Sequence, residues 1–173
     1  QLAAGLDTRS QAKTFIYAFL YGAGDAKIGS IVGGTARDGR RLKAKFLKNT
    51  PALGKLRERV VVASGRGFVF GLDRRKVSIR SEHAALNSLL QSAGAIIMKK
   101  ALCILDEYAT LHKINYKIIG NIHDEIQTEV ATEDAERFGR LATASIEAAG
   151  LHYELNCPLA GEYQIGDNWS ETH

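Results

Sequence analysis

The sequence predicts an α+β protein, because residues 1–80 carry helical patterns and residues 81–173 mix helical with strand patterns. Charge separates the same halves. Residues 1–80 have a net charge of +12 and residues 81–173 of −8, which together give the +4 of the 173-residue chain. A basic half next to an acidic half indicates two tasks: the first half would face a polyanion and the second would hold cations or face solvent. A solvated basic surface is the plain alternative.

The first half reads as a series of helices with recognisable ends. Thr8 and Gln11 have the spacing of a capping box, which predicts a helix from Arg9 to Leu20 or Tyr21, and Gly22 would end it. Pro51 suits the first turn of another helix. Further helical patterns and a short hairpin are expected over residues 26–32, 36–48, 51–63, 68–70 and 76–79.

The second half opens with a long helical pattern over residues 82–112. Two β-rich runs, 116–122 and 125–130, flank a two-residue turn and predict a hairpin. An amphipathic helix over 132–149 would end at Gly150. A final strand is expected at 161–165.

Composition excludes several classes of protein. With 45% hydrophobic and 24% charged residues, the chain is neither disordered nor collagen-like. Its apolar runs of about five residues fall far short of the roughly 20 of a membrane helix, so no membrane partner is expected. Cys103 and Cys157 lack the spacing of a disulfide framework or zinc site, which favours a cytoplasmic location.

Arg9, Lys13 and Tyr17 recur every four residues of the first predicted helix, and Tyr21 extends this stripe. Cations near a helix N-terminus oppose the helix dipole, and a bound polyphosphate would offset that cost. The two rings could stack on a base or cover a sugar. The stripe therefore indicates a nucleotide along the helix, although an amphipathic helix with scattered surface charge fits the spacing as well.

His123, Asp124 and Glu125 form the tip of the predicted hairpin. Adjacent carboxylates in a tight turn repel each other, and a divalent cation such as Mg²⁺ would relieve the repulsion. An ordinary surface turn is the alternative.

His83, Asn87 and Gln91 share one face of the long predicted helix. Amides suit hydrogen bonds to base edges in a minor groove, and surface polarity near a helix start is the alternative.

These residues carry a resemblance to family A DNA polymerases. Residues 9–22 resemble motif B, R-x3-K-x3-[FY]-x3-Y-G, and residues 121–125 resemble the motif C hairpin. Residues 83–94 resemble the helix between them that reads the minor groove of the primer-template, and residues 168–173 resemble the usual chain end. Within this family, the sequence most resembles the replicative polymerases of T-seven-type bacteriophages. For a phage-encoded protein, a cytoplasmic location means the cytoplasm of the host cell.

The resemblance implies a role for each matching residue. Arg9 and Lys13 would hold the dNTP phosphates, and Lys13 would protonate the leaving pyrophosphate. Asp124 would be a catalytic metal ligand in a two-metal Mg²⁺ site, supported by Glu125 and His123. The remaining positions would pack on the sugar, lie under the templating base or contact the primer-template: Tyr17, Tyr21, Gly22, His83, Asn87 and Gln91.

The resemblance further implies a helical fingers subdomain over residues 1–72 and the remainder of a palm over residues 73–173. Its motif A, which supplies another metal-binding Asp, is absent from the sequence. Since two-metal chemistry needs that carboxylate, we expect the chain alone to be inactive. Its partners would be primer-template DNA, a dNTP and an upstream polypeptide with motif A, the thumb and, in some members, an exonuclease. The alternatives are a non-catalytic nucleic-acid-binding module and an assembly subunit of a split polymerase.

Overall fold

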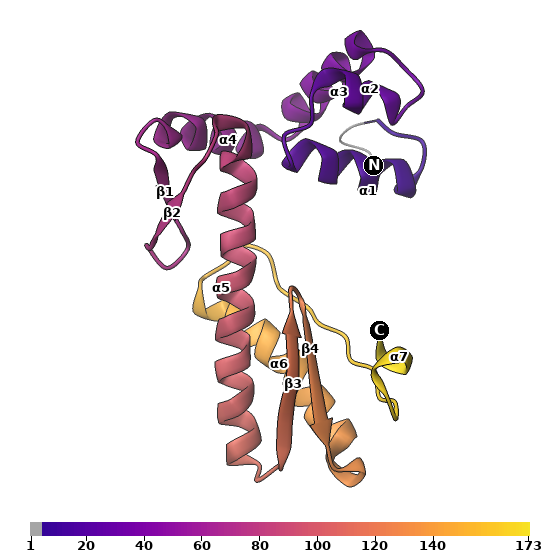
Figure 1. The fold of residues 1–173 in the computed structure, drawn as a ribbon, viewed down its shortest axis with the longest axis vertical. Helices are drawn as coiled ribbons and strands as arrows, with labels where there is room; N and C mark the ends of the chain where they lie inside the picture. Colours follow the sequence, from indigo (N-terminus) through magenta and orange to yellow (C-terminus); the bar gives the residue numbers. More distant parts are fainter. Residues whose placement is uncertain (1–4) are drawn as a thin grey trace. The chain divides into compact units, whose positions relative to one another are not determined.

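The computed structural model describes residues 5–173 and contains two compact units, which divide the sequence between Gln91 and Ser92 (Figure 1). Helices dominate both units, and each unit contains one two-stranded antiparallel sheet. The predicted α+β class is confirmed. The division into fingers and palm at residue 72 concerns function and stays a prediction.

Helix starts in the first unit follow the capping signals of the sequence. The Thr8 hydroxyl accepts a hydrogen bond of 3.1 Å from the Gln11 amide, and α1 begins at the next residue, Arg9. Pro51 occupies the first turn of α4. The elements are α1 (Arg9–Leu20), α2 (Asp25–Ser30), α3 (Ala36–Asn49), α4 (Pro51–Ser64), β1 (Phe68–Phe70), β2 (Lys76–Ser78) and the start of α5 (Glu82–Leu111).

Three aromatic rings form the centre of the core around α1. Phe15 and Phe19 meet Phe46 of α3 edge to face, with ring centroids 5.1 and 5.2 Å apart. Leu6 and Ile28 complete this cluster. Burying each such side chain stabilises the fold by about 1.5–3 kcal/mol. The contact therefore fixes which face of α1 points inward.

Helices α2 and α3 pack backbone to backbone, which glycine makes possible. A Cβ atom on Gly39 would collide with the Asp25 carbonyl oxygen and lie 2.6 Å from the Gly29 amide nitrogen. An ion pair of 3.0 Å between Lys43 and Asp25 joins the same helices, and Arg40 lies 3.2 Å from that carboxylate. These hydrogen-bonded cations, Lys43 first, lower the pKa of Asp25.

The second unit is built on the hairpin that the sequence predicts. β3 (Tyr116–Ile122) and β4 (Glu125–Val130) pair antiparallel, with Ile122 opposite Glu125 at the tip. The register shifts between Ile118 and Gly120. Such a bulge twists a hairpin locally and re-aims the side chains beyond it. The hairpin is followed by η1 (Thr132–Asp134), α6 (Ala135–His152) and α7 (Trp169–Thr172).

Two expectations for this unit are wrong. Residues 161–165 form no strand, because no other strand of the described residues lies beside them to complete a ladder. Their side chains pack on α6 instead, with Tyr163 against Gly139. The helix predicted over 132–149 begins as a 3-10 turn and continues past Gly150 to His152, because Gly150 provides close packing against Leu159 and does not end the helix.

Helix α5 is long and apolar enough to cross a membrane by length and mean hydropathy, unlike the shorter apolar runs counted in the sequence. Its apolar side chains pack against protein in both units. Ala85 joins the cluster of Val60 and Val69 in the first unit, and Leu105 joins that of Phe138 in the second. Each end of α5 thus packs against a hydrophobic cluster of its own unit.

The backbone contact at Gly39 yields a prediction about stability. Gly39→Ala should lower the free energy of unfolding by about 1–3 kcal/mol, because α2 and α3 must separate to admit the methyl group. Gly54→Ala is the matched control: the nearest atom to its new Cβ is a Leu47 methyl carbon 4.0 Å away, and alanine favours a helix by about 0.5–1 kcal/mol. Denaturant unfolding followed by circular dichroism measures both. Equal stability of the two variants would contradict the close packing.

Candidate functional site

Helix α1 presents the predicted stripe of cations and rings to solvent. Arg9 and Lys13 are exposed, and Tyr17 is 52% exposed. Phe15 and Phe19 are buried and lie roughly opposite the stripe, since each residue turns the helix by about 100°. Neither Arg9 nor Lys13 pairs with an acid of the described residues. Two unneutralised cations therefore lie on the N-terminal half of a firmly anchored helix.

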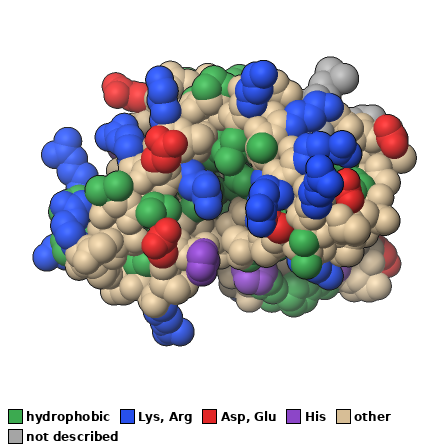
Figure 2. Space-filling model, turned by 90° about the horizontal axis from the view of Figure 1, so that it is seen from above, with side chains coloured by type: hydrophobic (Ala, Val, Ile, Leu, Met, Phe, Trp, Pro, Cys, Tyr) green, Lys and Arg blue, Asp and Glu red, His purple; other side chains and the backbone are tan. Residues whose placement is uncertain are grey.

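Basic side chains also dominate the surface around this helix. Most charged side chains on the face seen in Figure 2 are Lys and Arg, with a few acids between them. Helix α3 contributes exposed cations to the first unit, including Arg37, Arg41, Lys45 and Lys48.

The end of α1 contacts the start of α5 within the first unit. The Gln91 side-chain amide donates a 3.1 Å hydrogen bond to the Tyr21 hydroxyl. Gly22 has a φ of 77°, and a Cβ at this residue would lie 2.6 Å from the His83 carbonyl oxygen. Glycine is therefore required here for both conformation and space.

The structure thus brings together four residues for which the sequence predicts template or primer contacts: Tyr21, Gly22, His83 and Gln91. Asn87 is half-buried on the same helical face of α5 as His83 and Gln91. A cavity of about 420 Å³ adjoins them, lined among others by Phe19, Gly22, His83 and Leu86. Among residues 5–173, no hydrogen bond or ion pair joins this group to Arg9 or Lys13.

In the second unit, the two-residue turn of the hairpin is held by a residue in an uncommon backbone conformation. His123 has a φ of 55°, a region that glycine and asparagine adopt more readily. Strain of this kind concentrates at functional sites. The His123 side chain is exposed at this turn.

Asp124 and Glu125 differ sharply in their surroundings although they are neighbours. Asp124 is exposed and makes no hydrogen bond or ion pair within the described part of the chain. Glu125 is half-buried, and donors from Gln127, His173 and Trp169, in that order, lower the pKa of its carboxyl group. The turn therefore carries one free carboxylate and one that is already hydrogen-bonded.

Residues 5–173 contain no group of three or more acidic, histidine or cysteine side chains that could enclose a metal ion. Asp124 offers hard oxygen ligands of the kind Mg²⁺ prefers. The Asp124 carboxylate thus fits part of a magnesium site.

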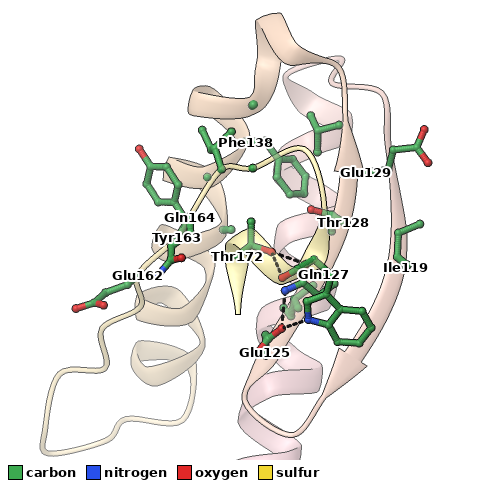
Figure 3. A pocket seen from close by; sticks show the side chains of 18 of the residues that line it. Ile119, Glu125, Gln127, Thr128, Glu129, Phe138, Glu162, Tyr163, Gln164 and Thr172 are labelled. Atoms are coloured by element: carbon green, nitrogen blue, oxygen red, sulfur yellow. Dashed lines mark hydrogen bonds between the residues drawn. The ribbon is translucent and has the colours of Figure 1, made fainter.

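A cavity of about 590 Å³ lies beside the hairpin in the same unit. β4, α6 and the segment over residues 162–169 line it, and Figure 3 shows Gln127, Thr128, Tyr163 and Thr172 around it. Sequence reasoning did not single out Gln127, Trp169 or His173 as contacts of Glu125. The single tryptophan was a usable signal, because an indole N–H can only donate a hydrogen bond and a carboxylate is a strong acceptor.

Comparison with known proteins gives consistent results. The model of the family described as DNA polymerase family A matches residues 3–171. The chain is 42% identical over 180 residues to the DNA-directed DNA polymerase of Escherichia phage Phieco32, covering 100% of this chain and 29% of that protein. It is 43% identical over 195 residues to the DNA-directed DNA polymerase of Escherichia phage T7, covering 100% of this chain and 28% of that protein.

A solved structure shares the fold at lower identity. It is the POL domain of Pol1 from M. smegmatis in complex with DNA primer-template and dNTP. The TM-score is 0.73 at 19% sequence identity, and the match covers 82% of this chain and 27% of that one. The chain therefore spans less than a third of the length of the curated relatives it matches.

Proposed function

The chain belongs to DNA polymerase family A, and from this premise we propose that it supplies nucleotide-binding and catalytic residues for template-directed DNA synthesis. The primer 3′-hydroxyl oxygen would attack the α-phosphorus of a dNTP, forming a P–O bond as the bond to pyrophosphate breaks. The observation that carries the proposal is the pair of unneutralised cations on α1, Arg9 and Lys13, held outward by the buried rings behind them.

Each residue on α1 has a task that its position supports. Arg9 and Lys13 would bind the triphosphate through charge-assisted hydrogen bonds, and Lys13 would give a proton to the leaving pyrophosphate. Tyr17, exposed one turn further along, would pack on the sugar. Tyr21 and Gly22 would lie under the templating base.

The other residues would hold the nucleic acid. His83, Asn87 and Gln91 would reach the minor groove near the primer end, where acceptors are common to all base pairs. His123 would support the primer terminus from the strained turn of the hairpin.

Polymerases of family A use Mg²⁺, and Asp124 is the residue that fits it best here, because its carboxylate is free. When bound, the cation supplies charge neutralisation at the phosphates and lowers the pKa of the attacking hydroxyl. Glu125 would take part as a ligand only by exchanging one of its present hydrogen bonds.

We propose further that a carboxylate from an upstream segment completes the site, and that the chain alone is inactive. Three observations support this. The described residues provide too few metal ligands, and the chain spans less than a third of its curated relatives. In addition, the outer edge of β4 and the extended residues 161–165 have no strand partner within the described chain, and a cavity lies between them. The upstream segment could be part of one chain or the other subunit of a split polymerase.

A non-catalytic nucleic-acid-binding module is the second candidate, and the basic exposed surface of α3 favours it. Such a module would bind duplex DNA with a steep salt dependence and without a response to dNTP.

The test of synthesis is complementation. Primer extension should be absent with the 173-residue chain alone and appear when the chain is joined to, or mixed with, an upstream family A polypeptide that carries motif A. Asp124→Asn should then reduce the rate by about 100-fold or more, since it removes a charge that acts on the reacting phosphates. Glu133→Gln, an exposed acid of the same unit, is the control and should leave the rate unchanged. Equal rates for both variants would contradict the role of Asp124.

The assignment of α1 makes a separate prediction. Arg9→Ala and Lys13→Ala should each weaken dNTP binding in the assembled polymerase by about 10- to 100-fold, the usual worth of a charge-assisted contact. Duplex binding should change little. Lys48→Ala, an exposed cation of α3, should do the reverse and affect only duplex binding. Titrations with labelled dNTP and labelled duplex measure the two affinities. A parallel loss of both in the α1 variants would favour the binding module.

A further inference from the structure

Three side chains surround the Glu125 carboxylate, and two of them lie more than 40 positions away in the sequence. The Trp169 indole N–H donates a 3.0 Å hydrogen bond to Oε1, which also accepts from the Gln127 amide. The Nδ1 atom of His173 lies 2.8 Å from Oε2, so the tautomer with a proton on Nδ1 donates to it. Both carboxylate oxygens are therefore engaged. Figure 3 draws the hydrogen bond between Glu125 and Gln127.

The segment that brings these donors is itself fixed by hydrogen bonds. The Thr172 hydroxyl lies 3.3 Å from the Gln127 side-chain oxygen and 3.2 Å from the Trp169 carbonyl oxygen. The Glu171 carboxylate accepts from the Asp167 amide at 2.9 Å and from the Asn168 side chain at 2.6 Å. Trp169 thus reaches Glu125 from a short, internally braced helix, α7, and His173 follows directly after that helix.

The consequence for the hairpin tip is a division between two neighbouring acids. Adjacent carboxylates repel each other, and hydrogen-bond donors around one of them stabilise its negative charge and set its direction. Here the donors gather on Glu125, and Asp124 keeps a free carboxylate. The Trp169 bond should matter more than that of His173, because the His173 side chain is 73% exposed and exposed pairs are weak.

We propose that Trp169 and His173 are positioning residues for the polymerase reaction: they hold the Glu125 carboxylate in one orientation, so that Asp124 beside it is the acid left to take the cation. This inference rests on the proposed function. Neither residue needs to touch substrate in this role. Outer partners of this kind change activity by about 10- to 100-fold when removed.

The first measurement concerns the contact alone and needs no activity. Trp169 is the single tryptophan, so the ¹⁵N-labelled chain gives one indole N–H resonance. Glu125→Gln should shift that resonance, because the indole loses a charged acceptor. Tyr163→Phe is the matched control: it removes a 2.8 Å hydrogen bond from the same segment to another acid, Glu136, and should leave the resonance in place. If the indole N–H resonance does not shift in Glu125→Gln, the inference is overturned.

The second measurement uses the assembled polymerase and separates positioning from structure. Trp169→Phe should lower kcat about 10-fold with little change in the KM for dNTP, and the loss should vanish in a Glu125→Gln background. His173→Ala should have a smaller effect that His173→Asn restores, because the asparagine amide can donate in place of Nδ1. Tyr163→Phe should leave kcat unchanged.

The outcomes distinguish this inference from the function on which it rests. A responsive indole together with an inactive wild-type assembly overturns the proposed function, and the positioning role with it. An active assembly in which Trp169→Phe keeps its kcat, or adds its full effect to that of Glu125→Gln, overturns the positioning role alone.

Discussion

The edge-to-face packing of Phe15 and Phe19 on Phe46 is the contact on which the account of the first unit depends. It fixes the rotation of α1 about its own axis, and with it the face that carries Arg9 and Lys13. Two cations on the N-terminal half of a helix are unfavourable by themselves. Burial of the rings on the opposite face of α1 directs both cations toward solvent. A triphosphate site requires charges that are positioned in advance in this way.

In the second unit, the fold likewise determines the surroundings of charged groups, here the two acids of the hairpin turn. A two-residue turn places two carboxylates side by side, and donors from distant residues hydrogen-bond one of them while the other stays exposed. The free carboxylate of Asp124 is the proposed metal ligand, and residues 5–173 contain no group of three or more side chains that could enclose a metal ion. An open strand edge beside a cavity lies in the same unit. Both observations support the proposal that a further polypeptide completes the site.

Local signals in the sequence predicted most of the fold, and they singled out the candidate site residues of α1, of the start of α5 and of the hairpin tip. The cap at Thr8 set the start of α1, and β-rich runs around His123 set both strands of the hairpin, because each depends on residues a few positions apart. The strand expected at 161–165 was wrong, since extended residues become a strand only beside a neighbour. The contacts of Trp169 and His173 with Glu125 join residues 44 and 48 positions apart, and no local pattern encodes such a pair.

The central claim assigns triphosphate binding to the cations of α1 and cation binding to the free acid of the hairpin. The most direct test is a structure of the assembled polymerase trapped with primer-template, the next dNTP and Mn²⁺, whose anomalous scattering locates the cation. The account predicts triphosphate oxygens in contact with Arg9 and Lys13, and Mn²⁺ on the Asp124 carboxylate. A triphosphate bound away from α1, or a cation that does not touch Asp124, would contradict it.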